Sequence, residues 1–118
     1  MTQAGGSLVG CLDESHREPL LLSTTEAAAI AKALGHPARF EILELFRTRC
    51  PRTVGDIATE IPLAASTVSN HLRILKDAGV IRTFRAEPRT WHCLNRSVIF
   101  GLADAVTNLT TKSQKPDS

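Results

Sequence analysis

The stretch from Thr53 to Ile81 constrains the fold of this 118-residue chain more than any other part of it. Its first half has apolar residues at helical spacing and ends at Pro62, which cannot donate a backbone hydrogen bond. Its second half repeats apolar residues at offsets of three and four from Ala65 to Gly79. The pattern predicts two short helices joined by a tight turn.

The second of these helices has a polar face with a particular order of side chains. Short hydroxyl and amide groups stand near its start and cations stand further along. The face carries Ser66, Thr67, Ser69, Asn70, Arg73 and Lys76. Short hydrogen-bonding groups at the start of a helix can reach base edges in the DNA major groove, and the cations can meet phosphates. The alternative is an ordinary solvated helix face.

Charge is distributed unevenly along the chain, and this favours the DNA-binding interpretation. The net charge of +2 says little by itself. Between Leu63 and Arg96, however, there are six arginines and lysines but only two acidic residues, which gives a local charge of +4. A local basic surface is typical of nucleic-acid binding.

Targeting signals are not visible in the sequence. It has no run of about 18 apolar residues that would suggest a transmembrane helix, and no signal-peptide pattern. We therefore expect a cytoplasmic protein with no membrane partner. In that compartment the three cysteines are expected to be reduced thiols.

The segments before the helix-turn-helix predict an arm and two further helices. Residues 1–23 are expected to form a flexible arm whose leucines at 20–22 dock on the body. Ser23 or Thr24 suits the cap of a helix of about 25–34, which Gly35 ends. His36-Pro37 then begins the next helix, since proline suits a first helical position.

The pattern changes after Gly79. VIRTFR and TWHCLN are rich in β-forming residues and are separated by residues 86–89, which predicts a hairpin. A hairpin after a recognition helix is the winged-helix arrangement. Arg85 and Arg89 lie on the hairpin or at its tip, where they can meet a minor groove or phosphates, or serve as solubilising charge.

A last helix is predicted from Ser97 to about Thr110. Its apolar stripe is larger than a small core needs, and comprises Val98, Leu102, Ala105, Val106 and Leu109. We interpret it as a dimer surface, together with the first helix. The prediction is a mainly α, winged helix-turn-helix homodimer with a β-hairpin wing, built from residues 24–110, followed by a disordered tail at 111–118.

At this level the chain resembles a known family. The segments KALGHPARFEILELF and STVSNHLRILKDAGVI, followed by a hairpin, are similar to the ArsR/SmtB family of metal-sensing repressors over about 25–109. The resemblance implies a homodimer that binds double-stranded operator DNA and an inducer that weakens this binding. The family's recognition-helix positions fall on Ser66, Thr67, Ser69, Asn70 and His71. For His71, a phosphate contact or packing is favoured over base readout.

The family places inducer sites at several positions, and two of them are missing from this sequence. The C-x-C pair of one arsenic site is replaced by Thr53-Val54-Gly55. The zinc site of the last helix has only Asp104. Some arsenic-responsive relatives instead have a cysteine pair in the arm, a segment like the REPL at 17–20, and a cysteine after the second helix. This chain matches with Cys50, but its arm has the single thiol of Cys11.

The remaining thiols favour a soft, thiophilic inducer. Trivalent arsenic, as arsenite or an organoarsenical, and antimony prefer thiolates, and no organic cofactor is expected. Cys11 and Cys50 are the predicted ligands, and Cys93 is either a third ligand or an inert strand residue. Arg47 and Arg49 are expected to lower the pKa of Cys50.

Three alternatives stay open. One is a thiol redox or sulfur-responsive repressor of the same fold, and another is a repressor without a small inducer. The third is an enzyme with Cys93 as nucleophile beside His92. Adjacent strand residues point to opposite faces, so these two cannot form a thiolate–imidazole pair. The chain is therefore not expected to be an enzyme.

Overall fold

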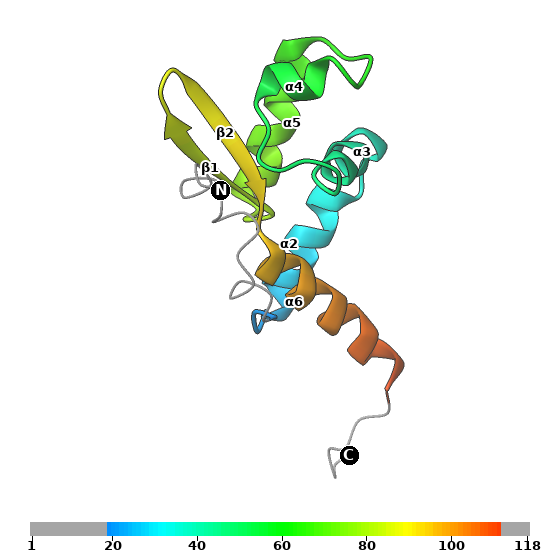
Figure 1. The fold of residues 1–118 in the computed structure, drawn as a ribbon. Helices are drawn as coiled ribbons and strands as arrows, with labels where there is room; N and C mark the ends of the chain where they lie inside the picture. The colour runs from blue at the N-terminus through cyan, green and yellow to red at the C-terminus, as the bar shows by residue number, and fades with distance from the viewer. Residues whose placement is uncertain (1–18, 112–118) are drawn as a thin grey trace.

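The computed structural model describes residues 19–111. The predictions for residues 1–18, Cys11 among them, and for the tail at 112–118 lie outside the described residues. Within residues 19–111 there are five α-helices, a 3-10 turn and a two-stranded antiparallel hairpin, which confirms the predicted winged helix-turn-helix (Figure 1). In chain order these are α2 Thr24–Leu34, α3 Pro37–Leu45, α4 Val54–Ala58, α5 Ala65–Asp77, β1 Ile81–Ala86, β2 Arg89–Leu94, α6 Arg96–Thr107 and η2 Asn108–Thr110.

Local side-chain chemistry sets the ends of the first two helices. The Ser23 hydroxyl accepts from the N–H of Glu26 at 3.1 Å, while the Glu26 carboxylate accepts from the N–H of Ser23 at 2.8 Å. Gly35 ends α2, and the ring Nδ1 of His36 accepts from the N–H of Ala38 at 3.1 Å to start α3. These contacts confirm the predictions that Ser23 caps α2, that Gly35 ends α2 and that His36-Pro37 begins α3.

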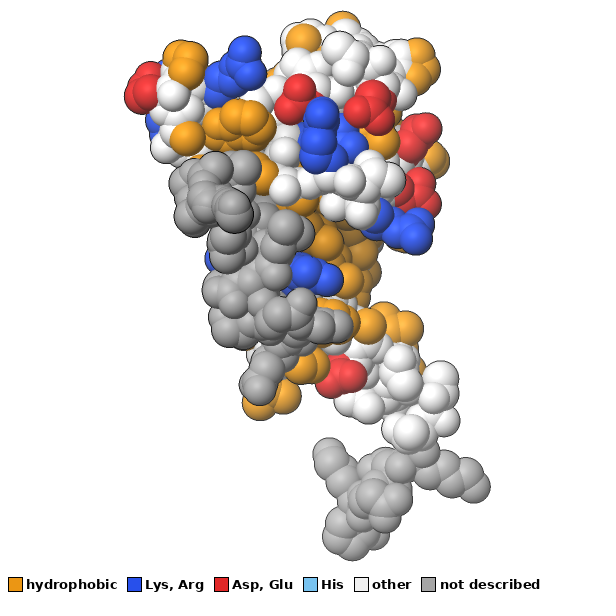
Figure 2. Space-filling view, in the orientation of Figure 1, with side chains coloured by type: hydrophobic (Ala, Val, Ile, Leu, Met, Phe, Trp, Pro, Cys, Tyr) orange, Lys and Arg blue, Asp and Glu red, His pale blue; other side chains and the backbone are white. Residues whose placement is uncertain are grey.

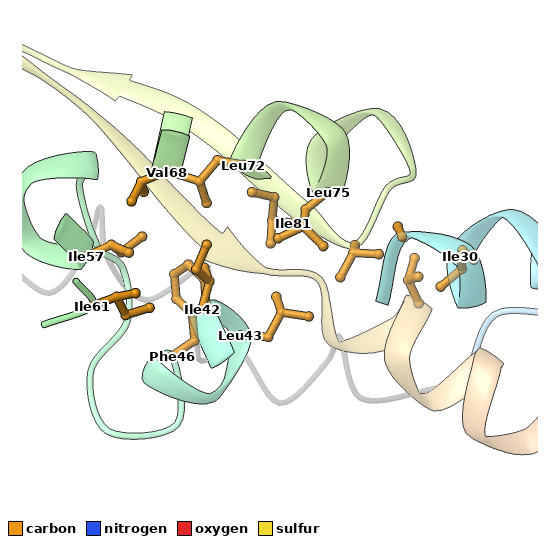
Figure 3. Packing of buried hydrophobic residues seen from close by; sticks show 13 residues of the cluster. Ile30, Ile42, Leu43, Phe46, Ile57, Ile61, Val68, Leu72, Leu75 and Ile81 are labelled. Carbon is orange, nitrogen blue, oxygen red and sulfur yellow. The ribbon is translucent and has the colours of Figure 1, made fainter. Parts of the chain in front are cut away.

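The core forms where α3, α4 and α5 meet the base of the hairpin (Figure 3). Val68, Leu72 and Leu75 of α5 are all buried, as the spacing predicted. They pack in one cluster with Ile42 and Ile57. Because this stripe faces inward, the opposite, polar face of α5 is left toward solvent.

The wing begins at a glycine. Gly79 has φ +83°, a left-handed conformation that lets the chain turn out of α5 into β1. In the hairpin Thr83 lies opposite His92, and Arg82 lies opposite Cys93. Arg52, from the connection between α3 and α4, adds a short bridge to β2: its N–H donates to the His92 carbonyl at 3.0 Å and its carbonyl accepts from the His92 N–H at 2.8 Å.

The last helix is only partly covered. Val98 is buried and Leu102 is half-buried, but Val106 is 52% exposed and Leu109 is 83% exposed. Figure 1 shows α6 running away from the body, and Figure 2 shows apolar side chains at the surface in the region of α2 and α6. No helix among the described residues is long and apolar enough to span a bilayer.

The segment before α2 docks on α6 mainly through its backbone. The N–H of Leu20 donates to the Ser97 carbonyl at 3.1 Å, and Leu22 packs against the core. Leu21 is 99% exposed, so the prediction that all three leucines dock is wrong for this residue. In an extended segment successive side chains point to opposite sides, so three in a row cannot all face the body.

Gly101 is what allows this close approach, and we predict that Gly101→Ala will disturb it. A Cβ at position 101 would lie 2.5 Å from the Leu20 carbonyl oxygen, so backbone must move. We expect a loss of about 1–3 kcal/mol in the free energy of unfolding, measured with urea. Gly55→Ala is the matched control, because its Cβ would meet nothing closer than 3.8 Å. Equal stability of the two variants would contradict the proposed role of Gly101.

Candidate functional site

The polar face of α5 is presented to solvent as predicted. The predicted DNA-contacting side chains on this face are all exposed: Ser66, Thr67, Ser69, Asn70, Arg73 and Lys76. Arg73 is oriented along the helix, since its Nη2 donates to Asn70 Oδ1 at 2.7 Å and its Nη1 lies 3.5 Å from Asp77. The face therefore combines short polar groups near the helix start with cations near its end.

His71 lies on the other side of α5. It is 9% exposed; its Nδ1 is 3.4 Å from Nη1 of Arg39, and its ring centroid is 4.8 Å from that of His36. Burial, followed by the charges of His36 and Arg39, lowers the pKa of His71. Its position between α3 and α5 favours the packing role over a phosphate contact, and the DNA contact of His71 stays a prediction.

The wing places two arginines near its tip. Arg85 donates to the Glu87 carboxylate at 3.0 Å and to the Thr90 hydroxyl at 2.9 Å, and Arg89 is exposed. The Arg85–Glu87 pair is at the surface, where such pairs contribute about 0–1 kcal/mol. A DNA phosphate can therefore replace the Glu87 carboxylate at little cost.

Two of the three cysteines lie next to each other. Cys50, half-buried after α3, has its sulfur 3.4 Å from the sulfur of Cys93, which is 2% exposed in β2. The Arg52–His92 bridge brings them together, because it lays the segment after α3 alongside β2. Of these two cysteines, Cys50 is a free thiol and the Cys93 sulfur is in a disulfide, so the expectation of reduced cysteines is wrong for Cys93. We call Cys50 and Cys93, in their reduced form, the thiol pair. Among residues 19–111 no group of three or more His, Cys, Asp or Glu side chains is arranged to hold a metal.

The electrostatics of Cys50 differ from the prediction. Burial raises the pKa of the Cys50 thiol, and a hydrogen bond from the Leu94 backbone and the charges of Arg96, Arg52 and Arg82 offset this only in part. The prediction that Arg47 and Arg49 lower this pKa is wrong: both side chains are exposed, and Arg49 lies 3.6 Å from Asp56. At neutral pH Cys50 is a protonated thiol, and a thiophile that binds it must displace the proton.

Arg52 is a functional candidate that sequence reasoning missed. Its guanidinium is 2% exposed, and Nε donates to the carbonyls of Leu45 and Arg49. Nη1 donates to the Glu60 carboxylate at 2.7 Å and Nη2 to the Thr48 hydroxyl at 2.9 Å. Its backbone N–H and carbonyl form hydrogen bonds with His92 of β2. One residue thus joins the end of α3, the turn after α4 and the wing; in the sequence it looks like one more surface arginine.

The outer face of α5 generates a testable prediction. We expect Arg73→Ala and Lys76→Ala to weaken binding to all duplexes alike, because phosphate contacts carry no sequence information. Each change should also reduce the slope of log affinity against log salt concentration by about one. Thr67→Ala and Asn70→Ala should instead change sequence preference. Fluorescence anisotropy with the protein's own promoter and with random DNA measures both, and Lys32→Ala on α2 is the control. If all four variants bind like the wild type, this face does not contact DNA.

Comparison with known proteins agrees with this geometry. Residues 34–83 match a family model described as a helix-turn-helix domain. The transcriptional repressor SdpR of Bacillus subtilis (strain 168) is 36% identical over 70 residues, which are 59% of this chain and 77% of that protein.

Solved structures share the fold. An ArsR-like transcriptional regulator from Rhodococcus sp. RHA1 has a TM-score of 0.66 at 20% identity, over 72% of this chain and 79% of that chain. A homodimeric winged helix-turn-helix DNA-binding domain from Mycobacterium bovis, described as a possible ArsR-family transcriptional regulator, has a TM-score of 0.59 at 28% identity, over 71% and 80%. The exposed polar recognition helix, the wing and these relatives lead to one conclusion: the chain belongs to the ArsR family of winged helix-turn-helix transcriptional regulators.

Proposed function

We propose that this transcriptional repressor leaves its operator when cysteine thiolates bind a trivalent arsenical or antimonial. The observation that supports this most directly is the 3.4 Å distance between the sulfurs of Cys50 and Cys93. At that separation one soft, thiophilic atom can bond to both sulfurs without a large backbone movement. Thiolates are the ligands that such atoms prefer over the harder oxygen donors.

The thiol pair supplies two sulfurs, and Cys11 is the proposed source of the third. An organoarsenical that takes two sulfurs needs only the pair, whereas arsenite, which takes three, needs Cys11 as well. This assignment gives Cys93 a larger part than the sequence suggested. The sequence alone left Cys93 as either a third ligand or an inert strand residue, because nothing in its local sequence indicates that Cys50 lies beside it.

The thiol pair has a short physical route to the DNA-binding elements. Cys50, Pro51 and Arg52 are consecutive, and Arg52 holds both the wing and the turn after α4. An atom bonded to both sulfurs fixes this connection relative to β2. We propose that the bonded atom holds the recognition helix α5 and the wing at a spacing that does not fit the operator. A 100-fold loss of operator affinity requires about 2.7 kcal/mol of coupling.

The test uses single cysteine variants and release from promoter DNA. We expect Cys50→Ser and Cys93→Ala to bind the operator normally and to ignore arsenite, antimonite and phenylarsenite, because neither keeps two adjacent thiols. Cys11→Ser should respond to phenylarsenite but lose most of its response to arsenite. Anisotropy of a labelled promoter duplex during titration measures release. Normal arsenite response of the Cys50→Ser variant would rule the site out.

The same distance also favours a second candidate, a redox-responsive repressor. An oxidant such as a peroxide can take two electrons and two protons from the thiols of Cys50 and Cys93, forming a disulfide between them and reducing the peroxide. Release by peroxide with a mass loss of two hydrogen atoms, and no release by arsenicals, would favour this candidate. Release by neither treatment would favour a repressor without a small inducer.

Dimerisation is part of the proposal, supported by the homodimeric relative and by the exposed apolar end of α6. We expect the double change of Val106 and Leu109 to glutamate to yield a monomer, because burying two charges in the interface is costly. It should also abolish operator binding, since each half loses its partner's half-site contacts. Sedimentation measures the mass, and Thr107→Glu on the polar side of α6 is the control. A double variant that still sediments as a dimer would place the interface elsewhere.

A further inference from the structure

A hollow of about 350 Å³ lies between the recognition helix and the wing. Three polar side chains of α5 and three of the hairpin line it, and Val54 and Leu72 contribute apolar walls. The polar lining consists of Ser69, Arg73, Lys76, Thr83, Thr90 and His92. Figure 1 shows α5 beside the two strands, so the hollow opens between the two elements that winged-helix proteins present to DNA.

The chemistry of this lining suits a phosphate group. Two cations and three hydroxyls converge on the hollow, and no acidic side chain is among the described residues that line it. Hydroxyls and cations are the side-chain groups that most often contact DNA phosphates. The Arg73 guanidinium is already held by Asn70 and Asp77, so less conformational entropy is lost when it binds an anion.

His92 supplies an independent observation. It is 8% exposed, and its Nδ1 lies 3.1 Å from the Thr83 hydroxyl, its cross-strand neighbour. Its Nε2 is buried and has no hydrogen-bond partner among the described residues. A buried polar atom without a partner costs free energy, and such atoms are uncommon in folded proteins. The orphan nitrogen therefore points to a partner outside the described residues.

We propose that this hollow, here called the phosphate seat, binds one phosphodiester of the operator backbone between α5 and the wing. The inference rests on the proposed DNA-binding function and adds Thr83, Thr90 and His92 to the contacts of α5. A phosphate held from both sides fixes the distance between recognition helix and wing. Because the contact is to the backbone, it sets the register of the protein on DNA without reading sequence.

The seat also lies back to back with the thiol pair. His92 and Cys93 are consecutive in β2, and successive strand side chains point to opposite faces. In the structure His92 meets Thr83 at the seat, while Cys93 meets Cys50. A ligand on the thiol pair therefore bonds directly to the strand that forms one wall of the seat.

A double-mutant cycle between protein and DNA tests the proposal. Single methylphosphonates, which remove one phosphate charge, are placed in turn along a promoter duplex. One position in each half-site should lower wild-type affinity about tenfold, as expected for hydrogen bonds to a charged group. The Thr83→Val/Thr90→Val variant should bind unmodified DNA about tenfold more weakly. The neutral linkage at that position should cost it less than it costs the wild type, because only the contacts of Arg73 and Lys76 are left to lose.

Two controls separate the seat from general damage. Thr83→Ser/Thr90→Ser keeps both hydroxyls and should bind like the wild type, while Thr111→Val removes a hydroxyl far from the seat. Additive losses at every phosphate, or wild-type affinity in the valine variant, would overturn the seat alone. A wild-type chain that binds no duplex would overturn the DNA-binding function and the seat with it.

Discussion

The buried guanidinium of Arg52 is the interaction on which the rest of the structure depends. It donates to the Leu45 carbonyl at the end of α3, to the Arg49 carbonyl beyond it, and to a hydroxyl and a carboxylate, so its own charge is paired. Removing the Glu60 carboxylate would leave the buried charge of Arg52 without its ion-pair partner. Because the Glu60 side chain is 43% exposed, the cost is smaller than that of breaking a fully buried pair. The same residue extends the hairpin by one bridge. The wing and the helix-turn-helix therefore form one body.

That shared body explains why the two candidate sites are neighbours. Fixing the segment at 50–52 against β2 brings Cys50 to Cys93 on one face of the strand, and the hairpin's position beside α5 closes the phosphate seat on the other. A regulator needs an inducer site whose occupation changes the DNA-binding surface. Here the single strand β2 separates the thiol pair from the phosphate seat, so a small displacement of β2 affects both sites.

Burial governs the chemistry of the sites more than nearby sequence charges do. Desolvation raises the pKa of Cys50 despite three arginines close to it, and desolvation is the main cause of the lowered pKa values of His71 and His92. Cys50 is thus held as a protonated thiol that becomes a thiolate when a thiophile replaces its proton. The two histidines remain neutral, so they pack or donate a single hydrogen bond and do not add positive charge.

Local periodicity and capping signals in the sequence determined the helices, the hairpin and the outward polar face of α5, because these depend on neighbours a few residues apart. Ser23, Gly35, Pro37 and the stripe of Val68, Leu72 and Leu75 all behave as their spacing indicates. Only the tertiary structure decided the roles of Arg52, Cys93 and His71. Their partners lie 8, 43 and 32 residues away, and contacts across such separations are set by how elements pack. In the sequence, an arginine that pairs with a distant carboxylate has the same local pattern as a surface arginine, and only the folded structure distinguishes them.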